Sequence, residues 1–321
     1  MIRILILLAA SVLFFYSCNE DFNPYAEYKE NYALTCILKS DSTFQVATLS
    51  HSYPPDEFNS GNGAVDPAIV GADIRIWYGD SVYVFKDSSI TRTDTSRYST
   101  PFRFYYNNRF KVRTNKNIEI EVLLQNGRRL KANSTTPGEI FFQDESTVLV
   151  PPVSSNIVQF YWDPLGEGTF YCPKFVLRYR QLINGEHVEK IKEIPVKYIQ
   201  QGNEFEAVFP DPSNASTIVY SMDAVTRALN EISDGDVNKQ NYSVYEFPVF
   251  DLIALDLPSS RYVSSTGQSF DDLTVSVNVS DYTNIEGGLG IFGSYTRKNY
   301  DRVRFYKDYI ESFGYNFIQE N

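Results

Sequence analysis

Apolar and polar residues alternate over short stretches of this chain, and turn-forming residues separate the stretches. Tyr32 to Leu38 alternates in this way, and Ile118 to Leu124 is joined through Asn126-Gly127 to a second alternating stretch, Arg128 to Ala132. Alternation with a period of two predicts half-buried β-strands, and Asn-Gly between two of them is typical of a tight hairpin. The pattern therefore predicts an antiparallel β-sandwich over residues 32–138.

The same pattern predicts more strands in this first domain, at residues 44–49, 69–77, 81–86, 102–106 and 110–113, the last two as a hairpin. Prolines and glycines interrupt the strands over residues 51–63, which predicts an irregular loop. Loops on a rigid scaffold often carry function. We therefore expect this loop to contact a receptor or nutrient, through the candidate residues His51, Tyr53, Asp56, Glu57 and Phe58.

A second domain is expected over residues 139–321. Trp162 ends one strand just before Pro164, and Tyr179 lies in the next strand, an arrangement that resembles strands B and C of a fibronectin type III domain. The resemblance implies that both rings are core anchors.

Further elements are expected in this second domain. Residues 226–232 are expected to form one or two helical turns, and further strands are expected at 188–194, 205–209, 217–224, 249–257, 273–279 and 302–306.

The predicted fold class is all-β, with two tandem antiparallel β-sandwiches. The first, over residues 32–138, is expected to be immunoglobulin-like. The second, over residues 139–321, is expected to be fibronectin type III-like with a C-terminal extension that contains a glycine-rich signature.

The glycine-rich signature runs from Asn284 to Gly293, and its second half matches the dinucleotide-binding pattern G-x-G-x-x-G. That pattern binds a nucleotide only when a strand precedes it and a helix follows it. Here Ser294 to Thr296 and the charged Arg297 follow, which is a poor start for a helix. We therefore expect a close approach between backbone segments that ends in a strand, rather than a nucleotide site.

The pattern at the N-terminus is typical of a targeting segment. Arg3 precedes an apolar run over residues 4–16, and Ser17-Cys18 follows directly. A small residue before cysteine at this place resembles a bacterial lipobox, in which the signal is cut before the cysteine and the cysteine is acylated; an ordinary secretory signal is the alternative. We expect residues 1–17 to be the signal peptide, Cys18 to carry lipid and residues 18–31 to be a tether.

Two longer segments carry a family resemblance. Ser280 to Ser294 is similar to the C-terminal signature of a family of Bacteroidota outer-membrane lipoproteins of unknown function, and Val65 to Ile74 resembles its N-terminal part. The acidic Glu20-Asp21 pair resembles the surface-export signal of such lipoproteins. The resemblance implies a lipid-anchored protein at the outer membrane, often encoded beside a TonB-dependent receptor, and it implies no catalytic residues.

Composition narrows the classes of partner. Hydrophobic residues make up 43% of the chain, enough for packed cores, and the formal net charge of -11 disfavours nucleic acid as a ligand. The chain has 24 Tyr and 23 Phe, which favour strands, and we expect alternating aromatic residues to form core pairs rather than a ligand platform. Cys36 and Cys172 lie in strand-like runs, where buried free thiols are expected, although the compartment permits a disulfide.

Residues for catalysis are few. The chain has two histidines, His51 and His187, and none of the common hydrolase or metal motifs. Asp234 to Asn238 begins like a calcium loop, but Lys239 replaces the required glycine. We therefore expect no catalytic residue, no cofactor and no metal. The leading hypothesis is a non-enzymatic binding or accessory protein; a structural or adhesive protein and a surface hydrolase for glycan or peptide are the alternatives.

Overall fold

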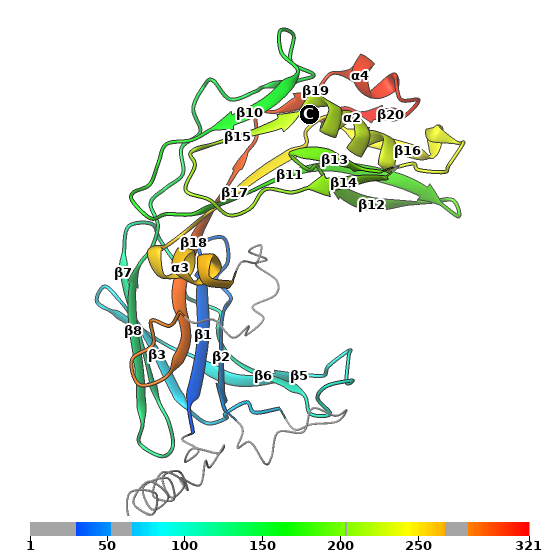
Figure 1. Ribbon diagram of the computed structural model, residues 1–321. Helices are drawn as coiled ribbons and strands as arrows, with labels where there is room; N and C mark the ends of the chain where they lie inside the picture. Colours follow the sequence, from blue (N-terminus) through cyan, green and yellow to red (C-terminus); the bar gives the residue numbers. More distant parts are fainter. Residues whose placement is uncertain (1–29, 53–65, 203, 267–281, 321) are drawn as a thin grey trace, which may run out of the picture.

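The computed structural model describes residues 30–52, 66–202, 204–266 and 282–320. Strands dominate these residues, which confirms the all-β class (Figure 1). Two lobes are visible, and a ten-stranded sheet extends through both of them, in the order β20-β16-β11-β17-β18-β1-β2-β6-β5 with β12 beside β11.

The first lobe consists of two packed sheets. One is an end of the ten-stranded sheet, formed by β1 (Tyr32–Lys39), β2 (Gln45–His51), β6 (Phe102–Asn107) and β5 (Lys86–Ile90). The other is a four-stranded sheet of β4 (Ser81–Val84), β3 (Asp73–Tyr78), β7 (Asn117–Leu123) and β8 (Arg129–Thr135). Alternate residues of both sheets, such as Leu34, Ile76 and Ile120, form a buried core between them. The predicted strands on either side of Asn126-Gly127 pair as β7 and β8.

The second lobe has a larger aromatic core. Phe160 and Phe250 stack with ring centroids 3.8 Å apart, and Trp162 and Tyr179 are buried in the same core, as expected of core anchors. The strands are β9 (Leu149–Val150), β10 (Ile157–Tyr161), β11 (Tyr171–Ile183), β12 (Glu186–Glu193), β13 (Lys197–Gln201), β14 (Glu204–Val208), β15 (Thr217–Ser221), β16 (Tyr242–Tyr245), β17 (Val249–Leu255), β19 (Arg304–Phe305) and β20 (Asn316–Ile318). The helices are α2 (Met222–Glu231), the short 3-10 helix η2 (Lys239–Asn241) and α4 (Lys307–Glu311).

Strand β18 (Leu289–Tyr300) joins the two lobes (Figure 1). Its first half pairs in parallel with β1, and its second half pairs antiparallel with β17. The two predicted domains therefore share one sheet, although the paired residues of β1 and β18, such as Ala33 and Leu289, are 256 positions apart in sequence. The boundary at residue 138 does not separate two independent sheets.

The glycine-rich signature makes the close backbone approach that was predicted. A Cβ atom on Gly288 would lie 2.6 Å from the carbonyl oxygen of Tyr32, and one on Gly290 would overlap the carbonyl oxygen of Leu34. Gly290 also has a φ of +108°, a conformation that side chains disfavour. Strand β18 begins within the motif, at Leu289, and continues beyond it where a nucleotide-binding unit has a helix, so the match to the nucleotide-binding pattern has no structural support.

Helix α3 (Leu257–Thr266) packs at the junction of the lobes, on the face of the ten-stranded sheet that carries Ile37 and Ile291, and it also contacts β8. Val263 of this helix contacts a small core that includes Ile37 of β1 and Ile291 of β18. Asp256 caps the helix, because its side chain accepts a hydrogen bond from the backbone N–H of Ser259 at 2.9 Å.

Several expectations about strand pairing are wrong. Residues 110–113 form no strand, and β6 pairs with β2 and β5 instead. The physical reason is that β2 already occupies the edge of β6 and that Asn107 turns the chain away, its Oδ1 accepting from the N–H of Arg109. The strand expected at 302–306 is only the two-residue β19, which pairs with β9 outside the ten-stranded sheet.

The sheets are also not purely antiparallel, because the pairs β1–β18, β16–β20 and β9–β19 are parallel. The strand expected at 273–279 lies outside the described residues, as do Cys18 and the loop residues Tyr53, Asp56, Glu57 and Phe58.

Candidate functional site

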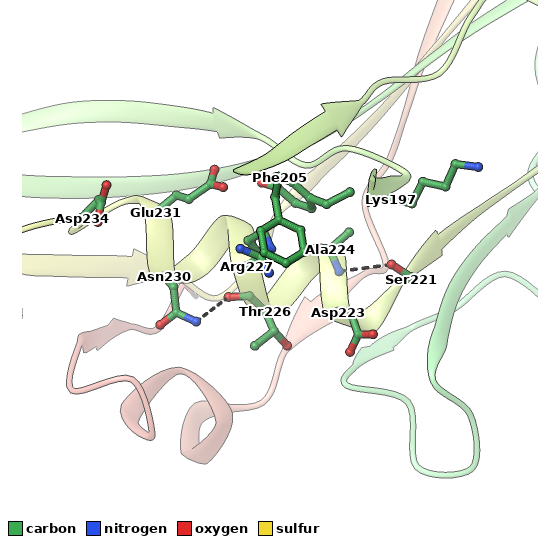
Figure 2. Close-up of a pocket in the computed structure, with 11 residues that line it drawn as sticks. Lys197, Phe205, Ser221, Asp223, Ala224, Thr226, Arg227, Asn230, Glu231 and Asp234 are labelled. Carbon is green, nitrogen blue, oxygen red and sulfur yellow. Dashed lines mark hydrogen bonds between the residues drawn. The ribbon is translucent and has the colours of Figure 1, made fainter. Parts of the chain in front are cut away.

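A hollow of about 680 Å³ lies between helix α2 and the β13–β14 hairpin (Figure 2). Ser221 begins the helix, its Oγ accepting from the N–H of Ala224 at 3.1 Å. The helix is amphipathic: Ala224, Val225, Ala228 and Leu229 are buried in the core of the second lobe. The opposite face lines the hollow, and its residues recur three or four positions apart, as a single helix face requires: Asp223, Thr226, Arg227, Asn230 and Glu231.

The side chain of Arg227 lies over two aromatic rings of the hairpin. Its Cζ is 3.7 Å from the ring centroid of Phe205 and 5.2 Å from that of Tyr198. Figure 2 shows Phe205 directly over Arg227. Within the part of the chain that is described, the guanidinium makes no hydrogen bond and no ion pair. The rings therefore hold a planar cation in place while its five N–H donors stay available to a ligand.

Tyr198 and Glu231 form the wall next to Arg227. The Tyr198 hydroxyl is buried and makes no hydrogen bond of ordinary geometry with the described residues. Burial, and secondarily the nearby Glu231 carboxylate, raise the pKa of the Tyr198 phenol, so it remains a protonated donor at neutral pH. Glu231 is itself held by Lys192, whose Nζ lies 2.6 Å from a carboxylate oxygen.

The charges around the hollow are of both signs. Lys197 and Arg227 supply cations, while Asp223 and Asp234 are exposed acids at the rim. Such a lining fits a ligand that combines an anionic group with hydroxyl or amine donors. The anionic group would pair with the cations, and the donors would form hydrogen bonds to the carboxylates.

The same residues are poorly placed for glycoside hydrolysis. Asp223 and Glu231 are eight residues apart on one helix, which separates their backbones by about 12 Å. Paired carboxylates in glycosidases are about 5–10 Å apart. Among the described residues there is also no group of three side chains suited to hold a metal ion.

The histidine proposed from sequence lies far from this hollow. His51 is the last residue of β2, where its Nδ1 is 3.0 Å from the carbonyl oxygen of Ser52 and 3.6 Å from the Glu30 carboxylate. Because the other four loop candidates are outside the described residues, the binding loop stays a prediction. Cys36 and Cys172 are free thiols, as expected.

Sequence reasoning identified the helical turns at 226–232 but not the hollow. The available signal was the polar face of that helix, with Arg227 and Glu231 four residues apart. In the described part of the chain, no helix has the length and apolar character needed to cross a bilayer. No model of a known protein family matches the chain, and no curated protein sequence shows significant similarity to it.

Proposed function

We propose that this protein is a non-enzymatic binding or accessory protein, anchored to the outer membrane by lipid on Cys18 and working with a TonB-dependent receptor in nutrient uptake. The signal-like N-terminus, Ser17-Cys18 and the family resemblance of its sequence support the location. The observation that carries the binding role is the Arg227 guanidinium, which lies over Phe205 in an open hollow without an ion-pair partner among the described residues.

The arrangement favours binding because the cation is pre-organised. A free arginine side chain loses rotamer freedom when it meets an anion, and that loss reduces affinity. Stacking on Phe205 restricts Arg227 before any ligand arrives, so less freedom is lost on binding. A carboxylate or phosphate of the ligand is the group that matches the planar N–H donors of Arg227.

The neighbouring groups restrict the ligand further. The buried Tyr198 hydroxyl would gain a partner if a ligand oxygen reached it, which removes the cost of a buried polar group without a hydrogen bond. Asp223 and Asp234 at the rim would accept from hydroxyl or amine groups. A small anionic solute that also carries several polar hydrogens is therefore the class of nutrient that we propose.

The test of anchoring and partnership is co-isolation from the native cell envelope. The tagged, full-length protein is extracted in mild detergent, and the proteins that accompany it are quantified by mass spectrometry. We expect a TonB-dependent receptor at near-equal amount, and loss of both lipid and receptor in the Cys18→Ser variant. A wild-type protein that carries lipid but isolates without any receptor would contradict the accessory role.

A further inference from the structure

A row of half-exposed aromatic rings lies on strand β6, on the face turned away from the core of the first lobe. Phe102, Phe104 and Tyr106 occupy alternate positions, while Tyr105 between them is buried in that core. The ring centroids are 5.9 Å apart for Phe102 and Phe104 and 6.2 Å apart for Phe104 and Tyr106. Phe44 extends the row, with its ring stacked 5.5 Å from that of Tyr106. We call these four residues the β6 aromatic row.

The row lies on the same face of the ten-stranded sheet as helix α3. Strand registers show this, because Val46 of β2 is opposite Tyr106, while Ala47 is opposite Tyr105 and faces the core. Helix α3 covers this face at β17 and β18 but does not reach β6. In Figure 1, β6 and β5 extend away from α3 at the far edge of the sheet.

Cations flank the β6 aromatic row. Arg92 lies over the rings of Tyr98 and Phe102, with its Cζ 5.0 Å and 5.3 Å from their centroids, and Arg97 lies 5.1 Å from the ring of Tyr98. At the other end, Lys86 of β5 is directly opposite Tyr106.

Among the described residues of this region, three acids have a cation or a backbone N–H as a partner. Asp66 contacts the guanidinium of Arg92. Asp87 is opposite the core residue Tyr105 and accepts from the N–H of Gly71 at 3.2 Å. Asp94 accepts from the N–H of Ser96 at 2.8 Å. The ion pairs in the described residues do not include Lys86 or Arg97.

The charge of this region is opposite to that of the whole chain. Residues 86–113 contain seven Lys and Arg but only two Asp and no Glu, whereas the protein has a formal net charge of -11. Of these seven cations, Lys86, Arg92 and Arg97 lie beside the row, and cations on an otherwise acidic protein attract anionic partners locally. A partner that is both anionic and able to lie flat on aromatic rings is therefore complementary to this surface.

We propose that the β6 aromatic row, together with Lys86 and Arg97, binds an extended glycan chain that carries carboxylate or sulfate groups. The apolar faces of successive sugar rings stack on successive aromatic side chains, and the anionic substituents pair with the flanking cations. A line of rings along one strand matches a linear polymer better than a single sugar. Because the row and the Arg227 hollow lie in different lobes, this inference does not depend on the function proposed for the hollow.

Binding of the full-length protein in detergent to two anionic glycans, polygalacturonate and chondroitin sulfate, tests the proposal, with neutral dextran and a single-stranded oligothymidylate as comparisons. We expect retardation in affinity gels that contain an anionic glycan, and weaker retardation as salt is added. Equal binding to dextran, tighter binding to the oligonucleotide, or no binding to either anionic glycan would overturn the proposal.

Substitutions assign the binding to the row. Phe104→Ala is expected to weaken binding about tenfold, the loss of one aromatic stacking contact. Phe104→Leu retains an apolar side chain and tests the ring separately from folding. Phe141→Ala is the control, since Phe141 is an exposed phenylalanine of the second lobe, away from the row. Lys86→Gln with Arg97→Gln is expected to reduce both affinity and its salt dependence. Unchanged affinity in both Phe104 variants would refute the assignment.

Discussion

The hydroxyl of Ser134 donates a 2.6 Å hydrogen bond to the carboxylate of Asp256, 122 residues further along the chain. Ser134 belongs to β8 in the four-stranded sheet, and Asp256 lies between β17 and α3. The Ser294 hydroxyl of β18 donates to the same carboxylate at 2.9 Å. A single buried acid therefore connects the four-stranded sheet, the strand that joins the lobes and helix α3.

Removal of the Ser134 hydroxyl is expected to weaken this connection. Ser134→Ala leaves a buried carboxylate with one donor fewer, which costs about 1–3 kcal/mol of unfolding free energy. Urea denaturation of the wild type and the variant measures the difference. Ser89→Ala on the exposed strand β5 is the control, and it is expected to change stability by less than about 0.5 kcal/mol. Equal stability of the two variants would show that the contact contributes little.

Stability is also expected to depend on the ionisation of Asp256. Burial raises the pKa of its carboxyl, despite the hydrogen bonds from Ser134, Ser294 and Ser259, which lower it. A raised pKa in the folded state means that this group favours folding below the ordinary Asp pKa of about 4, and that the benefit is lost as pH rises through the raised value.

The measurement compares the wild type with Asp256→Asn across this pH range. The unfolding free energy of the wild type, minus that of the variant, is expected to fall as pH rises. Subtraction removes the contribution of the other carboxylates, since both proteins contain them. A difference that rises with pH would show that the hydrogen bonds outweigh burial.

Gly290 is expected to tolerate no side chain. An added Cβ would overlap the carbonyl oxygen of Leu34, within the parallel pairing of β18 with β1. Gly79 has a positive φ too, +57°, but open space around it. Gly79→Ala is therefore expected to cost about 1–2 kcal/mol for backbone strain alone. Gly290→Ala is expected to cost at least about 1 kcal/mol more, because crowding adds to strain; thermal unfolding of both variants provides the comparison.

The two described thiols are expected to be unreactive in the native protein. Burial raises the pKa of the Cys172 thiol to about 12 and that of the Cys36 thiol still further, so neither forms appreciable thiolate at pH 8. Iodoacetamide is expected to modify both only after denaturation, as peptide mass spectrometry would show. Rapid labelling of Cys172 under native conditions would indicate that its partly exposed site opens easily.

Local features of the fold were predictable because neighbouring residues determine them. The hairpin at Asn126-Gly127 follows from turn chemistry, since Gly127 has a φ of +82° that glycine adopts without strain. The close approach at Gly288 follows from the lack of a side chain. The pairing of β1 with β18 was not predictable, because the sequence contains no signal for contact between residues 256 positions apart.

The aromatic residues of β6 show a second limit of prediction from sequence. Alternation at Phe102, Phe104 and Tyr106 correctly indicated a strand, and we expected core pairs. Both faces of β6 carry aromatic residues, however, so the pattern does not determine which face is buried. Tyr105 occupies the core, and the row lies outside it. The Arg227 hollow was missed for a similar reason, since its hairpin and helix come together only in the folded lobe.

We propose that the Arg227 hollow is the part of the protein that binds its small anionic ligand. The most direct measurement is the ligand recovered with the full-length protein from its native envelope, identified by mass spectrometry under native conditions, for three proteins. These are the wild type, Arg227→Ala, and Arg302→Ala as control, whose guanidinium is exposed and paired with Asp144 at 2.6 Å.

We expect a small anionic ligand with the wild type and with Arg302→Ala, and its loss, by about tenfold or more, with Arg227→Ala. Equal recovery of the ligand with Arg227→Ala and the wild type would contradict the claim, as would the absence of any small anionic ligand from the wild type.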